Sequence, residues 1–221
     1  MIHSSIHFWD MDRTLVDTDC DISWKLFLIH KGLAPITDLE VMEGYRKQYE
    51  EGRLEPEILN SFLLREFAGK TRAEMEFLAQ EHFEAFVRPM VYSQAFEMIK
   101  SIRNQGEKLC MITATNGEIA GPVARFLGFE KFLSTSLEII DGRYTGNISG
   151  IYCYGAGKIP YIERFCRENS TSIAEAYYYG DSIADIPVLE AVRHPVAVNP
   201  VPGLRQMAKE RGWNIIDFSK K

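Results

Sequence analysis

A short apolar run near the start of the chain, Ile6 to Trp9, ends in two aspartates that flank a single residue. Such a run before charged residues predicts a buried strand that leaves the core at Asp10. Because residues two apart in a strand face the same side, Asp10 and Asp12 are expected to point into one pocket at the carboxyl end of that strand. In open α/β sheets, ligands bind at this end of the strands.

The close spacing of Asp10 and Asp12 needs a chemical reason, because two neighbouring carboxylates repel each other. A hard divalent cation such as Mg²⁺ would supply one, since it takes oxygen ligands. A division of labour would supply another, with one aspartate as nucleophile and the other as proton donor. The plainer interpretation is a solvated Asp-rich turn capped by Thr14, which is typical of an isolated Asp-x-Asp-x-Thr pattern.

Composition limits the class of protein. The chain has 221 residues, of which 46% are hydrophobic, enough for one sizeable core or for a core and a small second domain. The net charge of −6 argues against a broad surface for nucleic acid or anionic membranes, but it permits a small anionic substrate. We see no signal peptide and no membrane-spanning run, so we expect a soluble, cytoplasmic protein.

The cysteines show neither a C-x-x-C pair nor zinc-ligand spacing. We interpret all four as free thiols in a reducing compartment: Cys20, Cys110, Cys153 and Cys166. Nothing in the sequence indicates an oligomeric state.

Hydrophobic periodicity divides the chain into two kinds of pattern. From about residue 17 to about residue 88 it predicts only helices, over 20–31, from Thr37, over 56–68, and after a capping-box pattern at Thr71. An all-helical block inserted after the first strand suggests a separate lid. We therefore expect a helical cap domain at 17–88 and a core domain made of 1–16 and 89–221.

From Val91 onward, strands alternate with helices, which predicts an α/β fold with a mostly parallel sheet. Asp141-Gly142 predicts a hairpin, and the tyrosine triplet 177–179 is interpreted as core and sheet face. The expected strands are 108–112, 177–179, 195–198 and 213–216, and the expected helices are 93–104, 118–127, 157–168, 183–192 and 203–211.

Polar residues of a consistent kind lie at the ends of these predicted elements. Thr113 follows a strand, Lys158 lies in a glycine-rich helix start, and Asp181 and Asp185 follow the strand 177–179. Together with the first aspartate pair they suit phosphoryl transfer, because a cation and an ammonium neutralise phosphate charge and helix-start N–H groups hold phosphate oxygens. Taken singly, each has a plainer interpretation as a helix cap or a solvated helix residue.

Four motifs resemble, in order, those of the haloacid dehalogenase superfamily of aspartate-nucleophile phosphatases. They are Asp10-Met11-Asp12-Arg13-Thr14, Thr113, Lys158, and Gly180-Asp181 through Asp185. The resemblance covers nearly the whole chain, and the helical block is similar to the C1-type cap of the phosphoserine phosphatase-like branch. It implies a Rossmann-like parallel sheet with an inserted all-helical cap.

The resemblance also implies roles. Asp10 attacks phosphorus, and Asp12 protonates the leaving alcohol and then activates water; an acid at Asp12 favours phosphate-ester hydrolysis. Mg²⁺ is held by Asp10, the Asp12 main chain and Asp181, and Asp185 supports the metal shell or Lys158. Thr113, Ala114 and Lys158 are expected to bind the phosphate of a small phosphorylated metabolite.

Substrate recognition is less determined. The resemblance places Asp19 where relatives bind a substrate amine, although a solvated helix-start acid is an equal alternative. A cap arginine that binds the substrate carboxylate in phosphoserine phosphatases is replaced here by Asn60, which weakens phosphoserine as the substrate; the spacing selects no substitute among Arg46, Arg53 and Arg65. Arg13 fills a slot that is often Gly or Ser in relatives and adds positive charge near the mouth.

Rival functions remain. Gly155-Ala156-Gly157-Lys158 resembles the end of a phosphate-binding P-loop, but Ile159 stands where Ser or Thr is required, and no Gly stands at Cys153 or its neighbour. The prediction is a Mg²⁺-dependent phosphatase of a small phosphomonoester. The alternatives are a non-enzymatic phosphate receiver, which would need neither the acid at Asp12 nor a helical insertion, and a degenerate binding protein of the same fold.

Overall fold

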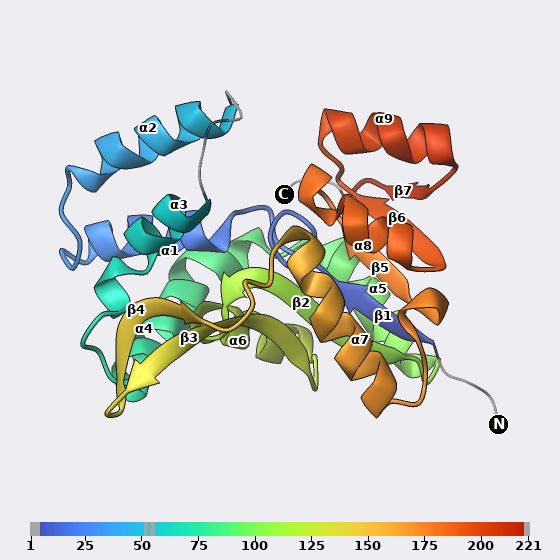
Figure 1. The fold of residues 1–221 in the computed structure, drawn as a ribbon, viewed down its shortest axis with the longest axis horizontal. Coiled ribbons are helices and arrows are strands. Elements are labelled where there is room, and N and C mark those ends of the chain that lie inside the picture. Colours follow the sequence, from blue (N-terminus) through green and yellow to red (C-terminus); the bar gives the residue numbers. More distant parts are fainter. Residues whose placement is uncertain (1–4, 51–52, 54–55, 219–221) are drawn as a thin grey trace.

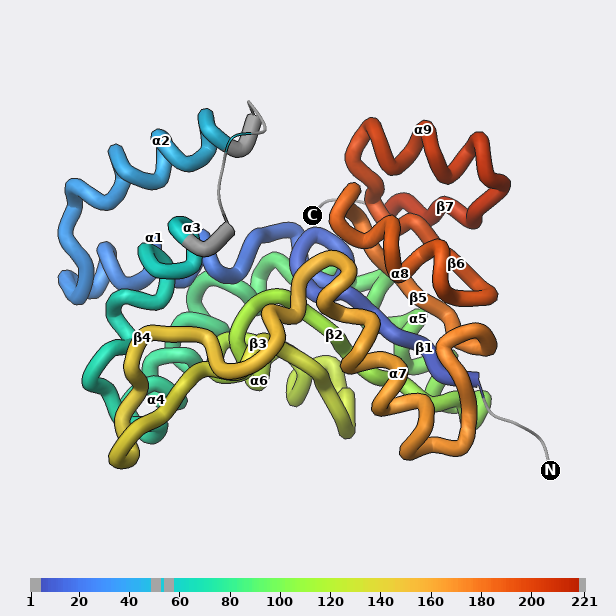
Figure 2. The backbone as a smooth tube through the Cα atoms, viewed as in Figure 1, coloured from blue at the N-terminus to red at the C-terminus, as the bar shows by residue number. Residues whose placement is uncertain are grey.

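One seven-stranded sheet organises the computed structural model, which describes residues 5–50, 53 and 56–218 (Figure 1). The strand order is β4-β3-β2-β1-β5-β6-β7, and only the β3–β4 pair is antiparallel. Figure 2 shows β1, in blue, running between β2 and β5. The strands are β1 (Ile6–Trp9), β2 (Lys108–Asn116), β3 (Phe132–Ile140), β4 (Arg143–Ser149), β5 (Tyr177–Gly180), β6 (His194–Val198) and β7 (Asn214–Ile216).

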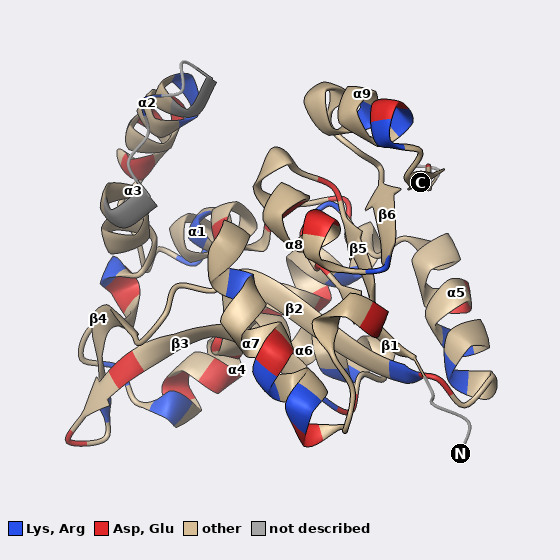
Figure 3. Ribbon diagram, turned by 45° about the vertical axis from the view of Figure 1, so that its right-hand side comes forward, with Lys and Arg blue, Asp and Glu red and all other residues tan. Residues whose placement is uncertain are grey.

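Helices precede, connect and cover these strands, which confirms the α/β fold. Acidic and basic residues alternate along the exposed faces of several of them, including α7 and α9 (Figure 3). The α-helices are α1 (Cys20–His30), α2 (Asp38–Glu50), α3 (Pro56–Leu63), α4 (Arg72–His82), α5 (Ser93–Asn104), α6 (Gly117–Leu127), α7 (Lys158–Glu168), α8 (Ile186–Ala191) and α9 (Pro202–Arg211). The short helical turns are η1 (Arg65–Phe67), η2 (Phe83–Val87), η3 (Arg88–Met90), η4 (Gly155–Gly157), η5 (Ile173–Glu175) and η6 (Ile183–Asp185).

Two hydrophobic clusters cover the two faces of the sheet. Neighbouring strand residues point to opposite faces, so Trp9 and Tyr179 join the cluster that includes α5 and α6, while Phe8 and Tyr178 join the cluster beneath α7, α8 and α9. All four side chains are buried. The central strands are therefore fixed from both sides, as expected for a parallel sheet covered by helices.

Between β1 and β2 the described residues form helices and turns without a strand, as the periodicity predicted. The capping box at the start of α4 is present: the Thr71 hydroxyl accepts from the Glu74 N–H, and the Glu74 carboxylate accepts from the Thr71 N–H. The β3–β4 hairpin holds this helical segment by backbone hydrogen bonds from Gly69 N to Tyr144 O (2.8 Å) and from Tyr144 N to Lys70 O (2.9 Å).

Three expected boundaries are wrong. The helix expected over 56–68 ends at Leu63 and is followed by η1. The strand expected over 108–112 continues to Asn116, because β2 keeps pairing with β3 beyond a register shift after Thr113. The helix expected over 183–192 starts as the η6 turn, in which Ser182 and Asp185 form a reciprocal cap before α8.

The four cysteines are free, as predicted, and the structure shows that all four are buried. Within the described ranges of the chain, no helix combines the length and apolar character needed to cross a membrane.

Candidate active site

Asp10 lies at the carboxyl end of the central strand and is the centre of the site. Its N–H donates to the Tyr179 carbonyl of β5 (2.9 Å), which continues the parallel ladder by one residue past β1. Its carboxylate Oδ1 accepts from Lys158 Nζ at 2.7 Å. The sheet changes direction of winding at β1, so this is the crevice where open α/β sheets bind ligands.

The Lys158 ammonium is buried and hydrogen-bonds to three side chains. Its ammonium donates to Asp10, to the Tyr178 hydroxyl (2.8 Å) and to Asp185 Oδ1 (2.9 Å), and it is 4% exposed. Burial alone would lower the pKa of Lys158, but the Asp10 and Asp185 carboxylates raise it well above its usual value. The first residue of α7 is thus held as a buried cation, not as a solvated helix residue.

Asp185 is the best-satisfied acid of the site. Its Oδ1 accepts from Lys158 and from the Tyr178 hydroxyl (2.5 Å), and its Oδ2 accepts from the Ser182 N–H and hydroxyl (3.2 and 3.1 Å). Burial opposes the charge, but Lys158 and Tyr178 hold the pKa of Asp185 below its usual value. Asp185 is therefore a fixed anion that orients Lys158.

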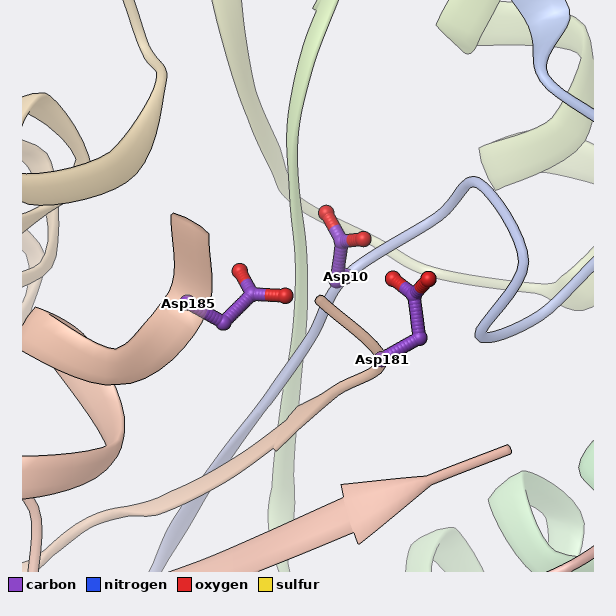
Figure 4. A group of neighbouring side chains, drawn as sticks. All are labelled: Asp10, Asp181 and Asp185. Carbon is purple, nitrogen blue, oxygen red and sulfur yellow. The ribbon is translucent and has the colours of Figure 1, made fainter. Parts of the chain in front are cut away.

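Three carboxylates, one just after β1, one just after β5 and one in η6, point toward a common space in Figure 4. Oxygens of Asp10, Asp181 and Asp185 all lie within 4.8 Å of one another, and all three residues are buried. Burial and the neighbouring acids raise the pKa of Asp10 to about 7 and that of Asp181 to about 9. Three carboxylates beside one ammonium leave an excess of negative charge, and this all-oxygen donor set fits a hard divalent cation.

Asp12 lies beside this group and faces the helical segment. Its Oδ1 accepts from the Cys20 N–H (2.7 Å) at the start of α1, and its Oδ2 accepts from the Thr115 hydroxyl (2.8 Å). Burial, followed by the charge of Asp19, raises the pKa of Asp12 to about 6. A carboxyl with such a pKa can donate a proton and take one back near neutral pH.

Thr113 lies inside β2 and not after it, which corrects the expected position. The Thr113 hydroxyl accepts from the Thr115 N–H (3.1 Å) and lies 3.5 Å from Asp12 Oδ2. Thr113 does not cap the following helix. The N-cap of α6 is Asn116, whose Oδ1 accepts from Glu118 N and Ile119 N. Ala114, which was also expected to bind phosphate, follows Thr113 in β2 and lines a cavity beside the site.

The expected substrate-recognition residues are spread more widely. Asp19 is the N-cap of α1, accepting from Ile22 N at 3.1 Å, and lies 3.9 Å from the exposed Arg13 guanidinium. Arg65 binds Asp38 at 2.6 Å, away from that cavity. Asn60 of α3 does line the cavity.

The two other arginines considered for the substrate carboxylate lie elsewhere. Arg46 pairs with Glu43 on the surface of α2, and Arg53 is exposed.

The Thr14 hydroxyl is buried and finds no hydrogen-bond partner in the part of the chain that is described. The capped-turn interpretation of the first motif is therefore wrong.

Four residues of the site were not expected from the sequence: Asp21, Thr115, Asn116 and Tyr178. Thr115 was within reach, because it is two residues after Thr113 in a strand and so shares its side. Tyr178 has its ring in the core, as the triplet suggested, but its hydroxyl binds Lys158 and Asp185. Asp21 and Asn116 carry no motif of their own.

Comparison with known proteins identifies the family. A model of the haloacid dehalogenase-like hydrolases matches residues 7–190. A histidinol-phosphatase of Neisseria meningitidis serogroup C is 32% identical over 219 residues, covering 97% of this chain and 99% of the relative. A probable phosphatase of Mycobacterium tuberculosis is 30% identical over 96% of this chain and 75% of its own length.

Solved structures agree. A Bordetella pertussis Tohama I protein of unknown function superposes with a TM-score of 0.89 at 32% identity, covering 97% of this chain and 99% of its own. A substrate-bound phosphoserine phosphatase has a TM-score of 0.70 at 17% identity, covering 96% and 92%, which shows a shared fold. The chain therefore belongs to the haloacid dehalogenase-like hydrolase family and is a phosphatase, a phosphoric monoester hydrolase.

Proposed function

We propose that this protein is a Mg²⁺-dependent phosphatase that hydrolyses a small phosphomonoester through a phosphoryl group on Asp10. The observation that carries the proposal is the pairing of Asp10 with Lys158 (2.7 Å) inside a group of buried carboxylates. One Asp10 oxygen is fixed by the ammonium, and the second remains to attack phosphorus.

In the first step, Asp10 Oδ2 bonds to phosphorus as the bond between phosphorus and the ester oxygen breaks. Asp12 gives its proton to the departing oxygen, so the alcohol leaves neutral. Lys158 neutralises charge on the transferring group, and Thr113 and nearby N–H groups orient its oxygens.

In the second step, the deprotonated Asp12 takes a proton from water, and the water oxygen bonds to phosphorus. The bond between phosphorus and Asp10 breaks, which releases phosphate and restores both carboxyl groups. The Cys20 N–H and the Thr115 hydroxyl fix the Asp12 carboxylate for both transfers. A phosphate receiver would not need a second acid held in this way.

The proposed metal ligands are the Asp10 and Asp181 carboxylates and the Asp12 main-chain carbonyl, with Asp185 in support. No hydrogen bond to the Asp181 side chain is found among the described residues, although the residue is only 4% exposed. A bound Mg²⁺ would compensate the charge of these carboxylates and of the phosphate.

We propose that residues 17–88 act as a cap that encloses the substrate. In support, the Cys20 N–H at the start of α1 donates to Asp12, so this segment reaches the candidate active site. The Neisseria relative named a histidinol-phosphatase supports L-histidinol phosphate as the first substrate to test. Phosphoserine is the second, from a 33% identical phosphoserine phosphatase of Mycobacterium tuberculosis that matches 68% of this chain and 49% of its own length.

The test is phosphate release from a panel of small phosphomonoesters and p-nitrophenyl phosphate, with and without Mg²⁺. We expect turnover that EDTA abolishes and Mg²⁺ restores, and a loss of about 10⁴-fold or more in kcat for Asp10→Asn, as for other covalent nucleophiles. Turnover of every ester by Asp10→Asn at the wild-type rate would contradict the proposal, and so would full activity in EDTA.

A further inference from the structure

The Lys158 ammonium has no N–H group left for a substrate. An ammonium has three N–H donors, and all three are used, by Asp10 at 2.7 Å, the Tyr178 hydroxyl at 2.8 Å and Asp185 at 2.9 Å. Two of these acceptors are carboxylates, whose hydrogen bonds to a cation are strong. A phosphate group that reaches Asp10 therefore needs a further donor for its oxygens.

Negative charge dominates the surroundings of Asp10. Burial raises the pKa of Asp10, and the Asp185 and Asp12 carboxylates raise it further. The Asp181 carboxylate also lies within 4.8 Å of Asp10 and Asp185. Because a phosphate ester is itself an anion, these carboxylates oppose its entry unless positive charge at the mouth of the site compensates them.

Arg13 is a second cation at this site. Its guanidinium lies 3.9 Å from Asp19 Oδ2, and its side chain is 61% exposed. Burial and the Asp10 carboxylate raise the pKa of Asp181, whereas Arg13 lies close enough to lower it. Among the residues that the structure describes, no hydrogen bond from this guanidinium is found, so its five N–H donors are available to an incoming ligand.

The backbone of Arg13 is unusual for an arginine. Its φ of 59° lies in the left-handed region, which glycine adopts at lower cost than a residue with a Cβ atom. The surrounding turn imposes this conformation, because Arg13 N donates to Thr18 O and Asn199 Nδ2 donates to Arg13 O, both at 3.2 Å. Strained residues of this kind cluster at functional sites, so an arginine at this position suggests a role for its side chain.

We propose that Arg13 binds the phosphate group of the substrate, with its guanidinium donating to two of the phosphate oxygens. The planar fork of a guanidinium matches two such oxygens, and the weak contact to Asp19 is given up in exchange. This inference rests on the proposed phosphatase function and adds a phosphate-binding residue to Lys158 and Thr113. Because the released product is also phosphate, Arg13 binds substrate and product alike.

The test is Arg13→Gly, assayed with Mg²⁺ on two esters of nearly equal size, O-phosphoethanolamine and n-propyl phosphate, which differ in an ammonium against a methyl group. We expect KM to rise about tenfold or more for both esters, since hydrogen bonds to charged groups contribute on this scale. We expect kcat to change less than about threefold, because the lost interaction is made equally in the ground state and the transition state. The inhibition constant of inorganic phosphate should rise by the same factor as KM.

The same variant reports on folding, because glycine relieves the positive φ. We expect its urea midpoint to equal or exceed that of wild type. Arg13→Lys keeps the charge without the planar fork, so it should restore part of the affinity. The matched control is Arg193→Gly, which removes a similarly exposed arginine (62%) that lies 3.5 Å from Glu175 and directly precedes β6, at the end of that strand opposite to the site. It should keep the wild-type KM and inhibition constant.

An unchanged KM and an unchanged inhibition constant in Arg13→Gly would overturn the inference. A loss confined to kcat, or a rise in KM for one ester alone, would overturn it too, because either result removes Arg13 from the bound phosphate. If wild type hydrolyses no ester, the proposed function fails, and calorimetric titration of both proteins with inorganic phosphate in Mg²⁺ tests Arg13 separately. A dissociation constant about tenfold higher in Arg13→Gly then supports the inference, and equal constants exclude it.

Discussion

The catalytic site and the neighbouring cavity differ in how the chain builds them. Asp10, Lys158 and Asp185 stand at or near the carboxyl ends of buried strands or at helix starts, and their positions follow from the sheet order. The cavity is assembled from α1, α3, the end of β2 and a loop after β4. On the proposed mechanism, a change in the catalytic site slows hydrolysis of every ester, whereas a change in the cavity leaves the chemical steps intact.

The two regions share one hydroxyl, that of Thr115, which lies between Asp12 and Asp21. A change on the catalytic side should therefore affect all substrates alike, and a change on the cavity side should affect substrates differently. Comparison of two esters in each variant distinguishes the two cases.

Lys158→Met should lower kcat about 10²- to 10³-fold for every ester, because on the proposed mechanism this buried cation neutralises charge on the transferring phosphate. The measurement is kcat for O-phosphoethanolamine and n-propyl phosphate, with the exposed Lys209→Met of α9 as control. A loss confined to the amine-bearing ester would show that the two regions are not separate.

Acidification should weaken the helical segment through His82. Burial lowers its pKa to about 4, against an ordinary value of 6.5, and its Nε2 is 2.8 Å from the Ser23 hydroxyl. Below pH 6.5, His82 binds a proton in the unfolded chain but not in the folded chain. The free energy of unfolding therefore falls as pH drops from about 6.5 to about 4, by about 3 kcal/mol at most.

The check is urea unfolding of wild type and His82→Gln across that range. His7, whose pKa burial and His194 also lower to about 4, contributes the same dependence in both proteins, and the acids with raised pKa values oppose it equally. The difference between the two proteins should therefore isolate His82. Parallel curves would contradict the prediction.

Tyr178→Phe should lower kcat about tenfold for all esters, because its hydroxyl accepts from Lys158 (2.8 Å) and donates to Asp185 (2.5 Å) and so positions both groups. Tyr179→Phe is the matched control, since that hydroxyl binds His7 on the opposite face of the sheet. A positioning role also predicts a shifted pH profile of kcat. An unchanged profile with an unchanged kcat would leave Tyr178 with a packing role alone.

Tyr152→Phe should have the smallest effect, raising KM for O-phosphoethanolamine about threefold with little change in kcat, because it removes one hydroxyl from a residue that lines the cavity beside Asp12. The control is Tyr154→Phe, whose side chain is more exposed. An equal fall in kcat for both matched esters would assign Tyr152 to the catalytic side.

The same difference explains how much the sequence could predict. Asp10 and Lys158 were found because apolar strand and helix patterns place them, and the family resemblance orders them. The length of β2 was missed because its pairing with β3 resumes after a bulge, which depends on the partner strand. Asp21 and Asn116 were missed because a cavity between segments far apart in the chain leaves no local pattern.

The most direct test of the whole account is chemical trapping of the proposed phosphoryl group. Wild type and Asp12→Asn would be quenched during turnover, reduced with borohydride, digested and analysed by mass spectrometry. We predict that Asp10 is converted to homoserine, and to a greater extent in Asp12→Asn, where the intermediate breaks down slowly. Modification of another aspartate, or phosphate release with Asp10 unmodified in both proteins, would contradict the assignment of Asp10 as the nucleophile.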